Sequence, residues 1–167
     1  QSAMNTQAVT LGDDGKYAAS ESLFVPLLAA AKRDLGADHP TTLRVMTSFG
    51  WMYRLQGRLP EAERLTRESL GRERRVFGND HSDTQAAVNN LGIILSDMKR
   101  PAEAEPYYLE GLAVSRRTLG EKQPETLASR VTLAPFYLKP AERGKADPPP
   151  TQSLPPLPPP LPPPLLP

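Results

Sequence analysis

Two histidines are the side chains of this sequence best suited to acid–base or metal chemistry. His39 and His81 each carry an imidazole, which titrates near neutral pH and binds transition metals. They lie one full sequence repeat apart, neither has another histidine nearby, and the chain contains no cysteine. Each also follows an aspartate at an expected helix start. A turn that caps the next helix is therefore favoured over a metal ligand or an acid–base group, and we predict no metal site.

The remaining residue types form no catalytic pattern. Glu63 with Arg67 and Glu68 with Arg72 are spaced i,i+4, which predicts ion pairs on a solvated helix, each worth roughly a few tenths of a kcal/mol. The 11 glycines are dispersed, without a phosphate-binding loop or a Gly-x-Ser-x-Gly elbow. The basic run that ends at Arg75 favours a solvated face over contact with an acidic partner. We therefore expect a protein that is not an enzyme and has no cofactor.

The charges of the chain nearly cancel, with 20 Lys plus Arg against 19 Asp plus Glu. This balance argues against nucleic acid or an anionic membrane as the partner. The longest apolar stretch, near Leu23 to Ala31, contains Pro26 and is too short to span a bilayer. With no cysteine and no secretory pattern, a cytoplasmic location is expected. Because the chain opens with Gln1, we expect a fragment of a longer protein.

The sequence repeats itself with a period of 42 residues. Matches fall in four separate blocks at this one offset, which chance does not readily produce. The matched blocks are Leu35-Gly36 with Phe77-Gly78 and Leu119-Gly120; Asp38-His39-Pro40 with Asp80-His81-Ser82; Gly15-Lys16 with Gly57-Arg58; and Glu61-Ala62-Glu63 with Glu103-Ala104-Glu105. Such self-similarity is typical of stacked structural repeats.

Each unit has the pattern of two helices. In the first helix, large and small residues recur at three- and four-residue spacing, which places them on one buried face. In one unit this face holds Met46, Phe49, Gly50 and Tyr53, and in the next it holds Val88, Leu91, Gly92 and Leu95. The glycine in each set predicts close approach of a neighbouring helix, which outweighs its propensity cost of about 1 kcal/mol.

The second helix begins after a turn at Gly57, with Pro60 in its first turn, where a missing N–H costs nothing. We expect this helix to run to about Val76, with Ala62, Leu65, Ser69 and Leu70 facing inward. After Gly78, either Asp83 or Thr84 is expected to cap the next helix.

The pattern of Met46, Phe49-Gly50, Tyr53 and Ala62 resembles the signature of the tetratricopeptide family. The 42-residue period, the Leu-Gly-x-Asp-His-Pro-x-Thr linker and the Asn89-Asn90-Leu91 run resemble the kinesin light chain branch, over roughly residues 1 to 140. The resemblance implies an all-α fold, a right-handed α-solenoid of antiparallel helix pairs. It also implies a protein-binding scaffold whose partner is left open.

We divide the chain into a degenerate first repeat (1–41), two sound units (42–83 and 84–125), a partial terminal repeat helix (126–146) and a disordered proline-rich tail (147–167). Gln7 stands where Phe49 and Leu91 stand in the other units, and Pro26 is expected to kink or break its helix. Pro135 and Pro140 interrupt the last unit. Because stacked repeats need about three units to bury a core, the fragment is expected to be marginal alone.

The first helices of the units are expected to line a concave groove that holds an extended peptide or a partner helix. The residues beside the packing face are the candidate contacts: Arg44, Thr47, Ser48, Trp51, Arg54 and Leu55, then Ala86, Asn89, Asn90, Ile93 and Asp97. Aromatic and arginine side chains are common binding anchors. The amides of Asn89 and Asn90 can pair with the backbone of an extended peptide, and the family resemblance implies that such asparagines contact cargo peptides. For Trp51, burial against the next unit is the alternative.

Two other interpretations remain open at this stage. The fragment is either a regulatory or sensor array cut from a multidomain protein whose catalytic or nucleotide-binding domain lies elsewhere, or a passive stretch of a longer solenoid. The tail adds a third question, since its prolines predict extended polyproline II. Pro155-Pro156-Leu157-Pro158 resembles the ligands of some WW domains, and profilin-type binding is also open; a low-complexity terminus or a misread coding end is the favoured alternative.

Overall fold

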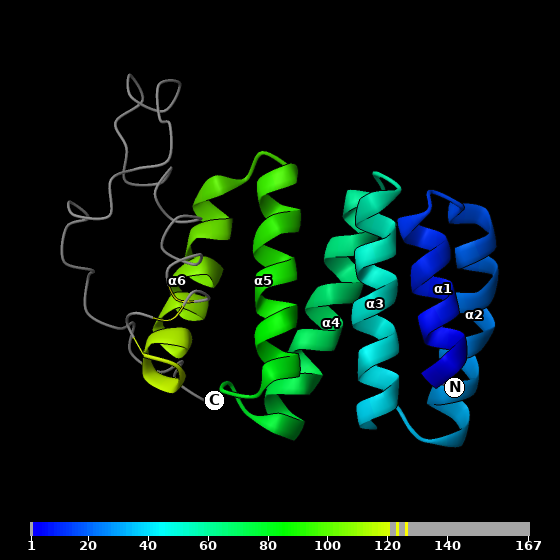
Figure 1. Cartoon of the computed structure of the whole chain (residues 1–167), viewed down its shortest axis with the longest axis horizontal. Helices are drawn as coiled ribbons and strands as arrows, with labels where there is room; N and C mark the ends of the chain where they lie inside the picture. Colours follow the sequence, from blue (N-terminus) through cyan, green and yellow to red (C-terminus); the bar gives the residue numbers. More distant parts are fainter. Residues whose placement is uncertain (1, 121–122, 124–125, 127–167) are drawn as a thin grey trace. The chain divides into compact units, whose positions relative to one another are not determined.

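The structure is a computed structural model that describes residues 2–120, 123 and 126. Within these residues it contains helices and no strands (Figure 1). The helices are α1 (Ser2–Asp13), α2 (Tyr17–Asp34), α3 (Pro40–Leu55), α4 (Leu59–Phe77), α5 (Ser82–Asp97) and α6 (Pro101–Thr118). None of these described helices is long and apolar enough to cross a membrane. The partial terminal helix, Pro135, Pro140 and the proline-rich tail lie outside the described residues.

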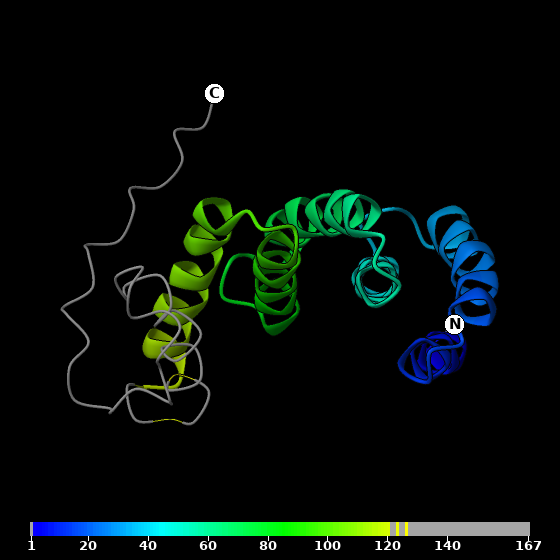
Figure 2. The ribbon, with the colours of Figure 1, turned by 90° about the horizontal axis from the view of Figure 1, so that it is seen from above.

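One compact unit spans Gln1–Tyr108 and holds α1 to α5 and the first turns of α6; a second begins at Leu109. In the first unit, α1 packs on α2, α3 packs on α4, and α3 also contacts α1, α2 and α5. Figure 2 shows α1 and α3 along one side of this unit, with α2 and α4 along the other. The predicted all-α fold of stacked helix pairs is confirmed.

The two histidines begin helices, as their spacing predicts. His39 is the N-cap of α3, and its Nδ1 accepts a hydrogen bond from the Thr41 N–H at 3.2 Å. His81 does the same for α5 with the Asp83 N–H, also at 3.2 Å. The prediction that Asp83 or Thr84 caps α5 is wrong, because both lie inside the helix. An unprotonated Nδ1 satisfies one of the N–H groups that a helix start leaves free.

Glycine ends the first helix of the middle unit, and a lysine does so in the next. Gly57 has a φ of 79°, and the following Arg58 N–H bonds the Tyr53 carbonyl at 2.9 Å. Lys99, 42 positions later, adopts a φ of 62°, and the next N–H bonds the Leu95 carbonyl at 2.9 Å. The turn therefore keeps its geometry without glycine, at the cost of left-handed backbone in a residue with a Cβ.

The first helix pair is complete, which corrects one expectation. Pro26 lies inside α2, yet the helix continues to Asp34. The prediction that this proline breaks the helix is wrong, because Pro26 is exposed while Phe24, Leu27 and Ala31 are buried and hold both halves against the core. An exposed carbonyl that loses its helical N–H donor can turn to solvent instead.

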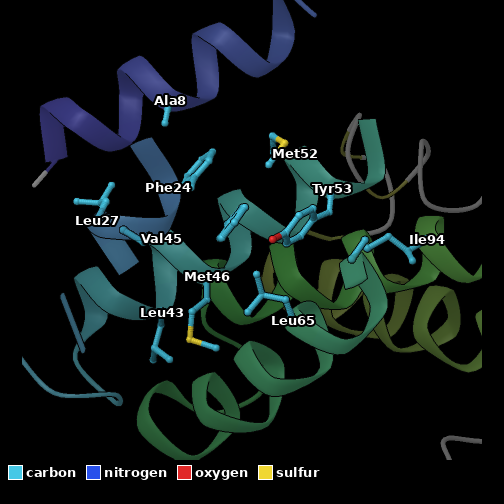
Figure 3. Packing of buried hydrophobic residues seen from close by; sticks show 12 residues of the cluster. Ala8, Phe24, Leu27, Leu43, Val45, Met46, Met52, Tyr53, Leu65 and Ile94 are labelled. Carbon is cyan, nitrogen blue, oxygen red and sulfur yellow. The ribbon is translucent and has the colours of Figure 1, made fainter. Parts of the chain in front are cut away.

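The predicted inward faces of α3, α4 and α5 are confirmed, since every residue assigned to them from the sequence is buried. An aromatic stack joins two units at the centre of this core (Figure 3). The ring centroid of Phe49 lies 5.0 Å from that of Phe24 on α2 and 4.4 Å from that of Tyr53. Gly50 lies directly against Thr66 of α4, and Gly92 against Tyr108, as the helix contact predicted for these glycines requires.

At a position that recurs in two repeats, an arginine forms hydrogen bonds with one glutamate of its own repeat and one of the preceding repeat. Arg58 donates to Glu21 of the preceding unit at 2.8 Å and to Glu61 of its own helix at 2.9 Å. Its guanidinium also lies 4.3 Å from the centre of the Tyr53 ring. The equivalent set one repeat later is Arg100 with Glu63 at 2.6 Å and Glu103 at 2.7 Å. The hydrogen bond from each arginine is the main cause of a lowered pKa in Glu61 and in Glu103, so these two carboxylates stay charged in mildly acidic solution.

Candidate peptide-binding surface

The candidate contacts lie on α3 and α5, which are neighbours in the first compact unit. We call them the α3–α5 surface, and it comprises Arg44, Ser48, Trp51, Arg54, Leu55, Ala86, Asn89, Asn90, Ile93 and Asp97. Arg44, Ala86, Asn89 and Asp97 are exposed, and the other members are half-buried. Every member can therefore meet a partner without unfolding a helix.

Trp51 is the centre of a cluster that bridges the two helices. Its side chain is half-buried, so it lies between the full exposure and the burial considered from the sequence. The Arg54 guanidinium carbon is 4.4 Å from the centre of the indole ring. Arg54 Nε donates to Asp97 Oδ2 on α5 at 2.6 Å. The arginine thus covers part of the indole while Asp97 holds it in place, which is a cation–π contact fixed by an ion pair.

Thr47 differs from the other predicted contacts because its hydroxyl forms hydrogen bonds with side chains of α4. It is therefore left out of the α3–α5 surface. Thr47 Oγ1 is 2.8 Å from Glu73 Oε1 and 2.9 Å from Ser69 Oγ. A side chain engaged in this way packs one helix of the unit on the other. Its equivalent in the next unit, Asn89, is exposed instead.

Two residues of α1 that the sequence analysis did not single out extend the surface. Asn5 Nδ2 donates to Ser48 Oγ at 3.4 Å, so a side-chain amide from the first repeat lies beside α3. Val9 is half-buried and occupies the position equivalent to Trp51 and Ile93. Asn5 lies two repeat periods before Asn89, and Val9 lies one period before Trp51, so the period gives both α1 residues. They were missed because unit 1 was treated as degenerate.

The α3–α5 surface has little net charge. Arg44 is exposed, whereas Arg54 and Asp97 neutralise one another. The side-chain amides of Asn89 and Asn90 make no hydrogen bond within residues 2–120. Amides can donate to and accept from a peptide backbone, so this part of the surface suits an uncharged main chain more than a strongly charged ligand.

Both histidines of the first compact unit cap helices, and several of its carboxylates form ion pairs. No group of three or more histidine and carboxylate side chains suited to a metal ion occurs in the described part of the chain. The predicted i,i+4 ion pairs are confirmed, with Glu63 and Arg67 at 2.9 Å and Glu68 and Arg72 at 3.5 Å. These contacts make Glu63 and Glu68 partners of arginines on the same helix.

Two family models, both described as tetratricopeptide repeat, match residues 1–75 and 84–125. The chain belongs to the tetratricopeptide repeat family. Repeats of this family generally mediate protein–protein interaction. No curated protein matches the sequence.

Solved tetratricopeptide-like structures share its fold. BtubC (BKLC) from P. vanneervenii matches with a TM-score of 0.68 and 21% identity, over 78% of this chain and 51% of that one. A putative kinesin light chain from Podosopora anserina with nearly identical TPR-like repeats matches with a TM-score of 0.75 and 21% identity, over 81% and 64%. A point variant of that same protein gives a TM-score of 0.74. The predicted likeness to kinesin light chain-like repeats is confirmed for the fold, and the chain spans only part of the length of these proteins.

Proposed function

We propose that this tetratricopeptide chain binds an extended peptide or a partner helix along the α3–α5 surface, as a non-catalytic scaffold. The observation that carries the proposal is the position of Trp51. It is a large aromatic side chain left half-exposed on a helix whose other aromatic side chains, Phe49 and Tyr53, are buried. Aromatic and arginine side chains are the residues most often responsible for binding energy at interfaces.

The neighbours of Trp51 favour a peptide with its main chain accessible. Asn89 and Asn90 offer amides without partners in the described residues, and Ser48 and Asn5 add polar groups from two other helices. Val9 and Ile93 stand at the equivalent positions on either side of Trp51 and supply apolar contact. A peptide laid across α1, α3 and α5 would meet apolar side chains and amides in turn, which gives affinity with modest sequence preference.

The proposal predicts that Trp51→Ala and Asn90→Ala weaken peptide binding without unfolding the chain. We expect Trp51→Ala to raise the Kd by about tenfold or more, which corresponds to about 1.4 kcal/mol, and Asn90→Ala to have a smaller effect. A titration of peptides selected from an array measures both Kd values. Circular dichroism verifies that the variants stay helical.

Arg64→Ala is a matched control because Arg64 is exposed on α4, outside the α3–α5 surface. Its Kd should equal that of the wild type. Equal Kd values for the wild type, Trp51→Ala and Asn90→Ala would remove the proposed site.

The alternative is a regulatory or sensor array within a larger multidomain protein. It is supported by the share of the similar solved proteins that this chain covers. The chain covers 51% and 64% of the similar solved chains, so it corresponds to part of a longer array in both cases. The proposed peptide binding and this alternative are compatible, because a sensor array also needs a ligand. A cytoplasmic location and the absence of nucleic acid and membrane partners remain predictions from composition.

For the tail, we propose a polyproline ligand centred on Pro155-Pro156-Leu157-Pro158. A preformed polyproline II segment loses little entropy on binding to an aromatic groove. A peptide of residues 147–167 should bind a Pro-Pro-Leu-Pro-specific WW domain, and replacing Pro156 and Pro158 by alanine should weaken this by roughly tenfold. Fluorescence anisotropy measures both affinities. Identical anisotropy curves for the two peptides would leave the tail without this role.

A further inference from the structure

The middle repeat differs from the repeat before it by a buried carboxyl group. Glu73 of α4 is 1% exposed. The position one repeat earlier, Ala31 of α2, is also buried but carries a methyl group. The residue equivalent to Ser69 in that unit is the buried Leu27. A contact that is apolar in the first unit is thus polar in the second, although burying an unpaired carboxylate is costly.

The short contacts around Glu73 outnumber the hydrogens of the two hydroxyls that make them. Oε1 of Glu73 lies 2.8 Å from both Thr47 Oγ1 and Ser69 Oγ. The two hydroxyls are 2.9 Å apart, and Ser69 Oγ is also 3.2 Å from the Leu43 carbonyl oxygen. Each hydroxyl carries one hydrogen. With an ionised carboxylate, both hydroxyls donate to Oε1, which leaves the contact between the two hydroxyls and the Leu43 carbonyl without a side-chain hydrogen.

A proton on the carboxyl group completes a chain of hydrogen bonds. The acid O–H of Glu73 donates to Thr47, the Thr47 hydroxyl donates to Ser69, and the Ser69 hydroxyl donates to the Leu43 carbonyl. Three hydrogens then serve three of the four contacts, the buried Leu43 carbonyl keeps a side-chain donor, and the Ser69–Glu73 contact is left without a hydrogen. We propose that folded Glu73 keeps its proton at pH values where the same carboxyl in the unfolded chain is ionised, and that its ionisation loosens the contact between α3 and α4.

The surroundings of Glu73 support this assignment. Glu73 Oε2 is buried and has no hydrogen-bond partner among the described residues, so a full negative charge would be poorly compensated there. Burial raises the pKa of the Glu73 carboxyl, the hydroxyls of Thr47 and Ser69 oppose that rise, and Asp83 of α5 adds to it. His81 opposes it more weakly, from a position where its ring stacks on Phe77 at 4.5 Å.

The sign of the pH dependence follows from the raised pKa. Between the ordinary glutamate value, about 4.3, and the value in the folded protein, the folded state binds more protons than the unfolded state. Stability from this group is complete below the ordinary value. It is lost as pH rises through the folded pKa.

The decisive experiment is a carboxyl titration of the full chain labelled with ¹³C at its glutamates, with Glu73→Gln used to assign the Glu73 signal. We expect the Glu73 carboxyl to titrate with its midpoint above the ordinary value of about 4.3. A midpoint at or below that value would overturn the proposal.

Urea unfolding between pH 4 and pH 8 gives a second readout. The wild type should lose stability relative to Glu73→Gln as pH rises, because the amide cannot ionise. Glu105→Gln removes one negative charge from α6 and should keep the pH profile of the wild type. A constant difference between the wild type and Glu73→Gln across this range would count against the proposal. If Glu73→Gln does not fold, the Glu73 carboxyl signal is assigned by through-bond NMR correlations in the wild type. The titration of that signal then tests the proposal by itself.

Discussion

Replacing Phe49 with alanine is expected to lower the free energy of unfolding by about 3–5 kcal/mol. Phe49 is 4% exposed and stacks between Phe24 of the preceding unit and Tyr53 of its own helix. Truncation removes both stacking contacts and leaves a cavity that the helices close only in part. Because a whole domain is typically stable by about 5–15 kcal/mol, most of the margin of this chain would be lost.

Urea unfolding followed by circular dichroism at 222 nm measures the effect. Val25→Ala is the control, because Val25 on α2 is 53% exposed and its truncation should change stability by about 0.5 kcal/mol or less. A loss for Phe49→Ala no larger than that of Val25→Ala would show that the aromatic stack does not join the first two units in solution.

The second large effect is expected at Gly50, where valine should cost about 2–3 kcal/mol. A Cβ at this position would lie 2.6 Å from Thr66 Oγ1 and 3.6 Å from the Ala62 carbonyl oxygen of α4. Thr66 is itself buried, so its side chain cannot move out to solvent. α3 and α4 must separate, which outweighs the gain in helix propensity from removing glycine.

Gly71 provides the opposite control in the neighbouring helix. It lies within α4, it is exposed, and a Cβ there would meet no atom within 4 Å. Gly71→Ala should therefore raise the free energy of unfolding by about 1 kcal/mol through helix propensity alone. Parallel urea titrations compare the two variants. If Gly50→Val is as stable as the wild type, the close approach of α3 to α4 is not the reason for glycine at position 50.

Much of the architecture could be predicted from the sequence because it is encoded locally and repeated. The three- and four-residue spacing of Met46, Phe49 and Tyr53 marks a helix face without knowledge of its partner. The 42-residue period predicts that neighbouring units present the same faces, and the buried residues of α5 confirm this. A capping turn at His39 and His81 could likewise be inferred from their place after an aspartate at a helix start, although the capping residue of α5 could not, since the sequence favours Asp83 or Thr84 there.

The expectations that failed or stayed incomplete depend on contacts between helices. Pro26 is accommodated because the other face of α2 is buried in the core, a property that no local pattern contains. The cluster of Trp51 with Arg54 and Asp97 joins residues from two units, and Thr47 is bound by Glu73 from the other helix of its own unit.

The sequence by itself thus determined the helices, their repeat and their buried faces, since periodicity and turn residues act over a few positions. Only the tertiary structure decided which polar side chains remain available on the α3–α5 surface and which carboxyl group is buried between α3 and α4. Hydrogen bonds and ion pairs act over about 3 Å, so their partners are chosen by how helices distant in sequence pack together.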